Sequence, residues 1–318
     1  MDDGVQHNTR AIEQTVITDL ADRMTYGGYL ELDRLLDAQH PLSDPEHHDE
    51  LLFIIQHQTT ELWLKLVLHE LSAACTYLRA DELAPALKCI ARVKHIQKTL
   101  TEQWSVLATL TPTEYAQFRG VLGNASGFQS AQYRAVEFTL GNKHAGMLRV
   151  FAAEAANLAL VTQALEAPSL YDEFLRLLAR QGYGIPASVL DRDVTKAWTY
   201  TPELVPVFTG IYADTTANWS AYETCEELVD LEDSFQLWRF RHLKTVERII
   251  GLKPGTGGSS GVPFLRRALE LTFFPELYAV RTELTEVQPT DSGEAGRRDA
   301  GGDPQAQRPD VRDPEARS

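Results

Sequence analysis

The chain has 318 residues, which is long enough for one large domain or two ordinary ones and for a substantial apolar core. Its 45 acidic residues outnumber its 30 basic residues, and the resulting net charge of -15 excludes the basic surface that nucleic-acid binding requires. With 43% hydrophobic and 24% charged residues, the composition is that of a globular protein, and it predicts no nucleic-acid partner.

The chain begins with MDDGVQHNTR, a polar and acidic stretch that lacks the basic and apolar regions of a signal peptide. No apolar run approaches the length that crosses a membrane, so no membrane association is predicted. The three cysteines, Cys75, Cys89 and Cys225, are odd in number and form no C-x-x-C pair, which favours neither disulfides nor a cysteine zinc site. We therefore expect a protein of the reducing cytoplasm.

Helical periodicity runs through nearly the whole body of the chain, with no sustained alternation that would indicate a sheet. We predict an all-α domain over residues 17–286, preceded by a partly flexible N-terminal extension over residues 1–16. Residues 287–318 are rich in Pro, Gly, Asp and Arg and are predicted to form a disordered tail, because they offer too little apolar surface to bury.

The first long helix is predicted to open at the capping box Ser43-x-x-Glu46, with Pro45, and to end near Leu78. A second helix is predicted over residues 83–107, where apolar residues keep roughly heptad spacing. A third opens at Thr111, where Pro112 and Glu114 repeat the capping box.

The longest predicted helix runs from about Ser220 to Ile250 and ends at Gly251. Its apolar stripe is interrupted at His242, where the period calls for a large apolar side chain. A buried imidazole must be satisfied by a hydrogen bond or by a metal, so His242 is either a bonded core histidine or an axial ligand of haem. A last helix is predicted from about Pro263 to Leu284.

Two further pairs of residues lie one helical turn apart. Phe53 and His57 are expected to face inward, where a ring and an imidazole could hold a flat heteroaromatic ligand; the alternative is a buried histidine bonded to a carbonyl. Tyr115 and Arg119 follow the cap at Thr111, and the guanidinium could grip a carboxylate or simply face solvent.

Two glycine-rich segments follow these pairs. The run GNASG, residues 123–127, would let the backbone approach a bulky planar group closely, unless it is only a turn between helices. The run GTGGSSG, residues 255–261, lacks the Gly-Lys-Ser/Thr ending of a phosphate-binding loop. We interpret it as a mobile lid with Thr256 as its directed polar contact, or else as a flexible connector.

Taken together, these motifs resemble one known family. The segments YGGYL, LDRLLDAQHPLS, HHDELLFIIQHQTTELWLKLVLHEL, EYAQFRGVLGNASGFQS, LEDSFQLWRFRHLKTVERIIG and GTGGSSGVPFL occur in the order found in tryptophan 2,3-dioxygenase, over roughly residues 25–284. The resemblance implies an all-helical bundle around a haem pocket, with haem b in the ferrous state, usually assembled as a homotetramer. It also implies insertion of both atoms of O2 into L-tryptophan to give N-formyl-L-kynurenine, the first step of tryptophan catabolism by the kynurenine pathway.

The same resemblance implies roles for individual residues. His242 would be the proximal haem ligand, and His57 would be the distal catalytic residue that accepts a hydrogen bond from the indole N–H. Phe53 would line the indole pocket. Arg119, assisted by Tyr115, would bind the substrate carboxylate, and Thr256 would contact the ammonium and carboxylate end.

The remaining implied contacts concern the cofactor and the assembly. Ser126, Gly127 and Trp104 would lie beside the haem. Three N-terminal residues would reach the active site of a neighbouring subunit: Tyr26, Tyr29 and Leu30. Three alternatives remain at this point: a haem sensor without turnover, a haem enzyme for another indole, and a helical scaffold.

Overall fold

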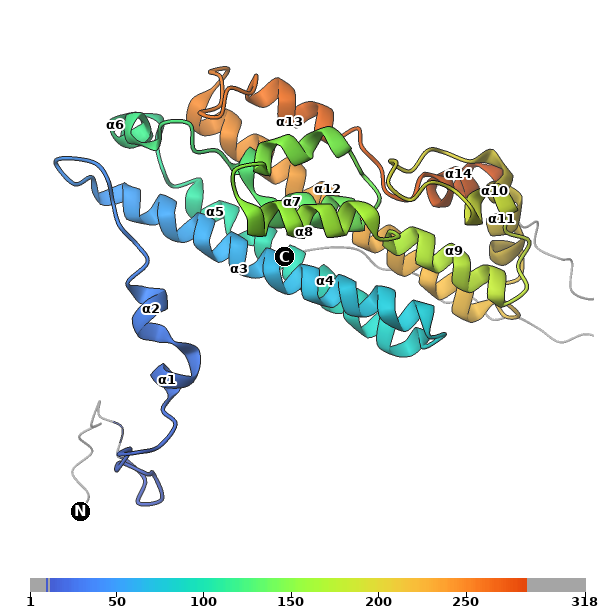
Figure 1. Ribbon diagram of the computed structural model, residues 1–318, viewed down its shortest axis with the longest axis horizontal. Coiled ribbons are helices and arrows are strands. Elements are labelled where there is room, and N and C mark those ends of the chain that lie inside the picture. The colour runs from blue at the N-terminus through green and yellow to red at the C-terminus, as the bar shows by residue number, and fades with distance from the viewer. Residues whose placement is uncertain (1–9, 11, 285–318) are drawn as a thin grey trace, which may run out of the picture. The chain divides into compact units, whose positions relative to one another are not determined.

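Helices make up the regular structure of the protein in a computed structural model that describes residue 10 and residues 12–284 (Figure 1). No strand occurs among these described residues, which confirms the prediction of an all-α fold. The predicted tail, residues 287–318, lies outside the described residues, as do residues 1–9 and 11 of the predicted N-terminal extension.

The described elements are α-helices and short 3-10 helices, and the 3-10 helices are denoted η. In chain order they are α1 (Tyr26–Leu30), α2 (Leu32–Leu36), α3 (His48–Arg79), α4 (Leu83–Glu102), α5 (Trp104–Leu107), α6 (Pro112–Phe118), η1 (Arg119–Leu122), η2 (Gly127–Gln129), α7 (Ala131–Thr139), η3 (Ala145–Phe151), α8 (Ala155–Glu166), α9 (Leu170–Arg180), α10 (Ala187–Leu190), η4 (Pro202–Leu204), α11 (Val205–Ala213), α12 (Trp219–Ile250), α13 (Val262–Ala268) and α14 (Pro275–Glu283).

Two helices of 32 residues, α3 and α12, form the frame of the body. Helix α4 packs against both of them, while α7 and α9 pack against α3 (Figure 1). The predicted bounds of α12 agree closely with the observed ones, and the helix ends where Gly251 adopts a φ of 60°. A positive φ is accessible to glycine at little cost, so Gly251 stops the helix as the sequence predicts.

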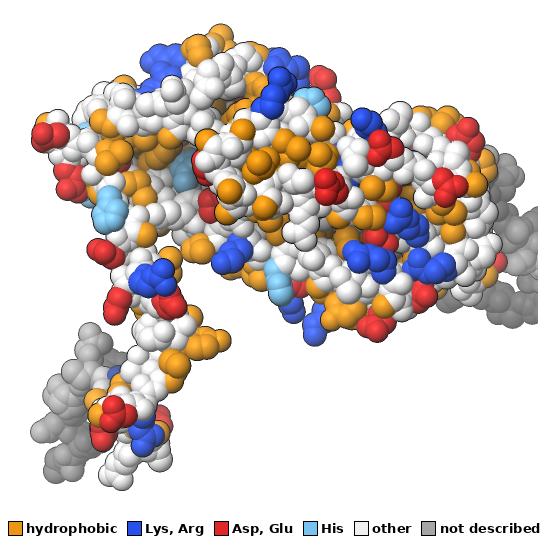
Figure 2. Space-filling model, in the orientation of Figure 1, with side chains coloured by type: hydrophobic (Ala, Val, Ile, Leu, Met, Phe, Trp, Pro, Cys, Tyr) orange, Lys and Arg blue, Asp and Glu red, His pale blue; other side chains and the backbone are white. Residues whose placement is uncertain are grey.

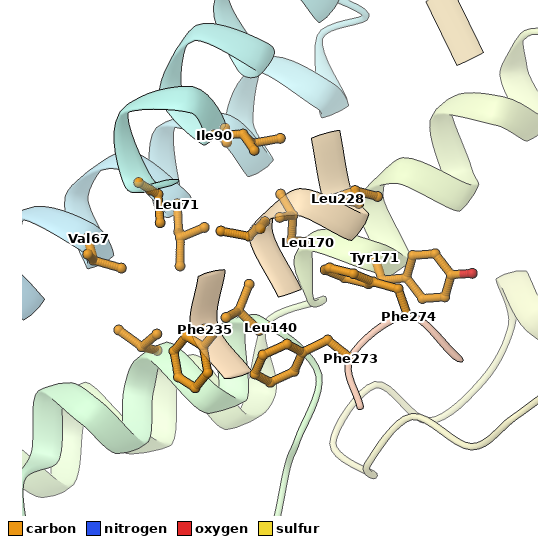
Figure 3. Packing of buried hydrophobic residues seen from close by; sticks show 14 of the residues in the cluster. Val67, Leu71, Ile90, Leu140, Leu170, Tyr171, Leu228, Phe235, Phe273 and Phe274 are labelled. Atoms are coloured by element: carbon orange, nitrogen blue, oxygen red, sulfur yellow. The ribbon is translucent and has the colours of Figure 1, made fainter. Parts of the chain in front are cut away.

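The core lies where α3, α4, α9 and α12 meet, and Figure 3 shows its side chains. Leu71, Ile90 and Leu228 are fully buried there, one from each of α3, α4 and α12. The apolar spacing that predicts these helices is therefore the spacing of the residues they bury. Burial of such side chains is worth roughly 1.5–3 kcal/mol each relative to exposure.

The start of α3 differs from the predicted capping box. The helix begins at His48, and Ser43 contacts Glu50 instead of Glu46: the Ser43 Oγ donates to Glu50 Oε2 at 2.5 Å and accepts from His47 N. Glu50 is 2% exposed and also accepts the Leu42 and Ser43 backbone N–H groups. Glu46 is only one of several acidic residues that follow Ser43, and the buried Glu50 carboxylate, which collects three donors, is the one that Ser43 contacts.

The prediction of one continuous last helix is also wrong. Residues 263–284 form two helices, α13 and α14, separated by a turn that carries Phe273 and Phe274 into the core. Burial of both rings requires the backbone to leave the helical path. The freed Phe274 N–H donates to the buried Glu232 carboxylate of α12 at 2.9 Å, and Pro275 then starts α14.

None of the helices in the described part of the chain is long and apolar enough to cross a membrane. Cys75, Cys89 and Cys225 are all buried and unpaired.

A buried ionic cluster joins α7 to α12. Arg239 and Glu137 are each 3% exposed, and the Arg239 Nη2 donates to Glu137 Oε1 at 2.7 Å. Tyr133 donates to the same carboxylate at 2.8 Å, and Arg134 pairs with its other oxygen. Both oxygens of the Glu137 carboxylate are paired, so loss of this carboxylate leaves positive charge without compensation in the core.

We therefore expect Glu137→Gln to lower the free energy of unfolding by about 3 kcal/mol, because two arginines lose their counter-charge. Urea denaturation followed by circular dichroism measures this change. The matched control is Glu247→Gln on α12, which removes the partner of the exposed Lys244, also on α12. It should leave the unfolding curve nearly unchanged. Equal effects of the two variants would contradict the interpretation of the cluster.

Candidate functional site

His57 of α3 and His242 of α12 are brought toward one another by the packing of the two long helices through α4. They lie close enough that His57 contributes to lowering the pKa of His242. The sequence predicts each histidine to face inward but cannot predict that they meet, because they are separated by 185 positions along the chain. The structure therefore joins two candidates that the sequence leaves separate.

His242 lies beside two tryptophans that also contact each other. The Trp104 ring stacks on the imidazole with centroids 4.7 Å apart and an interplanar angle of 10°, and the Trp238 ring lies 5.7 Å away. Desolvation by these surroundings, and then the nearby His57, lower the pKa of His242 to about 4. The imidazole is therefore neutral near pH 7, which is the form that binds a metal.

His242 makes no hydrogen bond within the part of the chain that the structure describes. The indole N–H groups of Trp104 and Trp238 are buried and also lack a partner among the described residues. Buried polar atoms are rarely left in this state. Two such atoms beside an imidazole without a side-chain partner favour a site that accepts a further group over a bonded core histidine.

His57 has a defined tautomer. Its Nδ1 lies 2.7 Å from the carbonyl oxygen of Phe53, one turn earlier on α3. A carbonyl can only accept, so Nδ1 carries the proton and the neutral ring keeps an acceptor lone pair on Nε2. Desolvation lowers the pKa of His57 below its ordinary value, although the bond to Phe53 and the charge of Glu61 oppose the shift. Near pH 7, His57 is therefore a neutral hydrogen-bond acceptor at Nε2.

An aromatic wall extends from His57. The Phe53 ring lies 4.2 Å from the His57 ring, and the Tyr115 and Phe118 rings lie 5.8 and 5.7 Å from Phe53. The capping box at Thr111 is confirmed: its side chain accepts from Glu114 N, and the Glu114 carboxylate accepts from Thr111 N. That cap starts α6 and so sets the direction of the two rings that α6 contributes.

Arg119 lies at the edge of this wall. Helix α6 ends at Phe118, so Arg119 begins the 3-10 helix η1 and is not in the predicted α-helix. Its guanidinium lies near the Tyr115 hydroxyl, where its charge opposes the rise in the Tyr115 pKa caused by burial, and its Nη2 donates to the carbonyl oxygen of Pro254 at 2.6 Å. A guanidinium has five N–H donors, so these contacts leave donors for a carboxylate.

The two glycine-rich segments contact each other. The Thr256 Oγ1 donates to the carbonyl oxygen of Ala125 at 2.5 Å. Ser126 caps η2, its Oγ accepting from Phe128 N, and Gly127 is the first residue of η2. Thr256, Ser126 and Gly127 are therefore neighbours across this contact, which the sequence alone does not predict.

Tyr26, Tyr29 and Leu30 are not packed in this site within the chain. They lie on α1, where Tyr26 is 77% exposed, Tyr29 is 76% exposed and Leu30 is 40% exposed. Neither α1 nor α2 contains a buried residue, and Figure 2 shows hydrophobic side chains on the surface of this N-terminal segment. Apolar side chains at such exposure favour contact with another chain.

Sequence reasoning missed two groups at this site. One is the ring of Trp238 beside His242, which its spacing of four residues from His242 could have indicated, since that spacing places both on one face of α12. The Pro254 carbonyl oxygen is the other group, and no sequence signal could have found it, because its contact with Arg119 spans 135 positions.

The fold and site define an all-helical protein with two inward histidines beside an aromatic wall and a cation. The family model described as Tryptophan 2,3-dioxygenase matches residues 11–210 and 206–284. The chain is 71% identical over 279 residues to a tryptophan 2,3-dioxygenase of Kineococcus radiotolerans, a match that covers 88% of this chain and 98% of the relative. It is 68% identical to one of an Arthrobacter strain and 58% identical to one of Xanthomonas campestris, matches that cover 88% and 92% of this chain and 99% of each relative. The chain belongs to the tryptophan 2,3-dioxygenase family.

Proposed function

We propose that this protein is a haem-dependent dioxygenase that converts L-tryptophan and O2 to N-formyl-L-kynurenine, the first step of tryptophan catabolism by the kynurenine pathway. The observation that carries the proposal is His242 against Trp104 and Trp238, within electrostatic range of His57, whose aromatic wall has Arg119 at its edge. A haem sensor would have no use for a guanidinium at that edge, and a helical scaffold would have no use for two inward histidines.

The residues around His242 fit haem b. The neutral imidazole lacks a partner among the described residues, and its neighbours are flat apolar rings, as a porphyrin site requires. His242 would be the iron ligand, with Trp104, Ser126 and Gly127 beside the porphyrin. When bound, ferrous haem supplies the chemistry that activates O2.

His57 would orient the indole ring of the substrate. With Nδ1 committed to the Phe53 carbonyl, Nε2 can accept the indole N–H, while the Phe53 ring stacks on the heterocycle. Indole is electron-rich at C3, so its reaction needs no strong base. We assign His57 to hydrogen bonding and positioning and not to obligatory proton abstraction.

The amino-acid end of the substrate would bind at the opposite edge. Arg119 would hold the carboxylate through two parallel hydrogen bonds, and Tyr115, whose hydroxyl lies near the guanidinium, would assist it. Thr256 would contact the ammonium and carboxylate groups from the loop. That loop also covers this edge and would exclude water from the reacting atoms.

We further propose a homotetramer in which α1 reaches a neighbouring active site through Tyr26, Tyr29 and Leu30. The exposure of these side chains supports the proposal. A single catalytic domain over residues 17–286 and a cytoplasmic location complete it; the three unpaired, buried cysteines are consistent with a reducing compartment.

The activity is tested with the full chain supplied with haem, a reductant, O2 and L-tryptophan. We expect the absorbance of N-formylkynurenine to grow, and mass spectrometry to find two heavy oxygen atoms in the product when ¹⁸O2 is used. A haem sensor would give the Soret band of bound haem but no product. Absence of product under these conditions would refute the proposed function.

The role of His242 is tested by His242→Ala, which removes the only proposed iron ligand. We expect haem content, measured as pyridine haemochrome, to fall to roughly a tenth of the wild-type value or less, with partial recovery of the Soret band on addition of imidazole. His95→Ala, at an exposed position of α4, is the matched control and should retain haem. Full haem content in His242→Ala would contradict the assignment.

The role of Arg119 is tested by Arg119→Ala. Loss of charge-assisted bonds to the carboxylate should raise KM for L-tryptophan roughly ten-fold or more. Indole has no carboxylate, so its inhibition constant should change little and serves as the control. The assignment fails if KM is unchanged, or if binding of tryptophan and indole weakens equally.

A further inference from the structure

The loop of residues 251–261, which follows α12, contacts the segment of residues 119–127, which follows α6. At one end, the Arg119 Nη2 donates to Pro254 O at 2.6 Å; in the middle, the Thr256 Oγ1 donates to Ala125 O at 2.5 Å. These contacts join residues more than 130 positions apart and hold the loop closed over the edge of the site.

Gly257 lies at the tightest point of this contact. A Cβ built on Gly257 would lie 2.7 Å from the Ser126 Cβ and 3.1 Å from the Ser126 Oγ. Carbon atoms at 2.7 Å overlap strongly, since their optimal separation is about 3.5–4.0 Å. Any side chain at position 257 would therefore push the loop and Ser126 apart.

Ser126 has little freedom to move away. Its Oγ accepts from Phe128 N, and its N–H donates to the Gln129 side chain, so it forms the capping box that starts η2. The overlap would be with the Ser126 Cβ, which follows the backbone and cannot be relieved by rotation of the hydroxyl. The loop is thus the partner that would have to lift.

The conformation of Gly257 does not itself require glycine. Gly258 and Gly261, in the same loop, have φ of +84° and +68°, which favour glycine for backbone reasons, whereas Gly257 does not lie in that region. Position 257 therefore requires glycine because there is no room for a Cβ beside Ser126.

We propose that Gly257 is a positioning residue for the reaction: its missing side chain lets the loop seat on Ser126, which places Thr256 and closes the edge of the substrate site. The inference rests on the proposed function for its consequence in catalysis. The closure itself is a property of the chain and can be measured without any substrate.

The experiment compares cleavage of the haem-loaded full chain by subtilisin within residues 252–261, located by mass spectrometry, for wild type and Gly257→Ala. Proteases require a locally opened loop. We expect Gly257→Ala to be cleaved roughly ten-fold faster, the population shift that a moderate overpacking penalty implies. KM for L-tryptophan should rise in the same proportion, while haem content stays at the wild-type level.

Two variants make the test specific. Gly255→Ala is the matched control, because its Cβ would meet at 2.6 Å only the Ser259 Oγ, a hydroxyl that can rotate away; its loop should be cleaved at nearly the wild-type rate. Adding Ser126→Gly to Gly257→Ala removes the colliding atoms, so the cleavage rate should return to that of Ser126→Gly alone.

The proposal is overturned if Gly257→Ala is cleaved at the wild-type rate, if Gly255→Ala opens the loop equally, or if Ser126→Gly gives no recovery. These outcomes are separate from failure of the proposed function. If the wild type forms no N-formylkynurenine, the dioxygenase assignment fails, yet the cleavage rates still decide the role of Gly257.

Discussion

The central constraint in this protein is an imidazole held in apolar surroundings without a partner among the described residues. His242 lies on α12 beside Trp104 and Trp238, and desolvation there keeps the ring neutral near pH 7. A helix that only needed a core would place leucine at that position at lower cost. The fold around it, with α3 and α12 joined through α4, brings the second imidazole, His57, within electrostatic range of the first.

Local signals in the sequence predict the helices well where short-range physics decides them. The capping box at Thr111 and the stop at Gly251 depend on residues within one turn, and both are confirmed. The interrupted helix over residues 263–284 could not be predicted in this way. Its break is stabilised by burial of Phe273 and Phe274 and by Glu232, which is 42 positions from Phe274 in the chain.

The same division applies to the candidate site. The one-turn spacing of Phe53 and His57 predicts their contact, and the structure gives their rings a separation of 4.2 Å. The residue type of Arg119 indicates a clamp, but its contact with Pro254 depends on how a distant loop folds back. Arg239 was also missed. A cation three residues before His242 on an apolar face is a signal that a buried acidic partner is needed, yet only the tertiary structure identifies it as Glu137.

One short stretch of chain links these features. Ser126 contacts the loop at Gly257, and η2 follows Ser126 in the chain. Ser130 then caps α7, and Glu137 of α7 pairs with Arg239 of α12. About a dozen residues and a buried ion pair therefore connect the contact point of the loop to α12, the helix that bears His242. Because packed helices of this kind resist small displacements, the edge of the site where the carboxylate would bind is held at a fixed place relative to the imidazole. A dioxygenase must align the indole ring and the amino-acid end of its substrate at the same time, so the distance between these two parts of the site has to be fixed. The chain fixes it by placing the turn of residues 123–127 shortly before the capped helix α7.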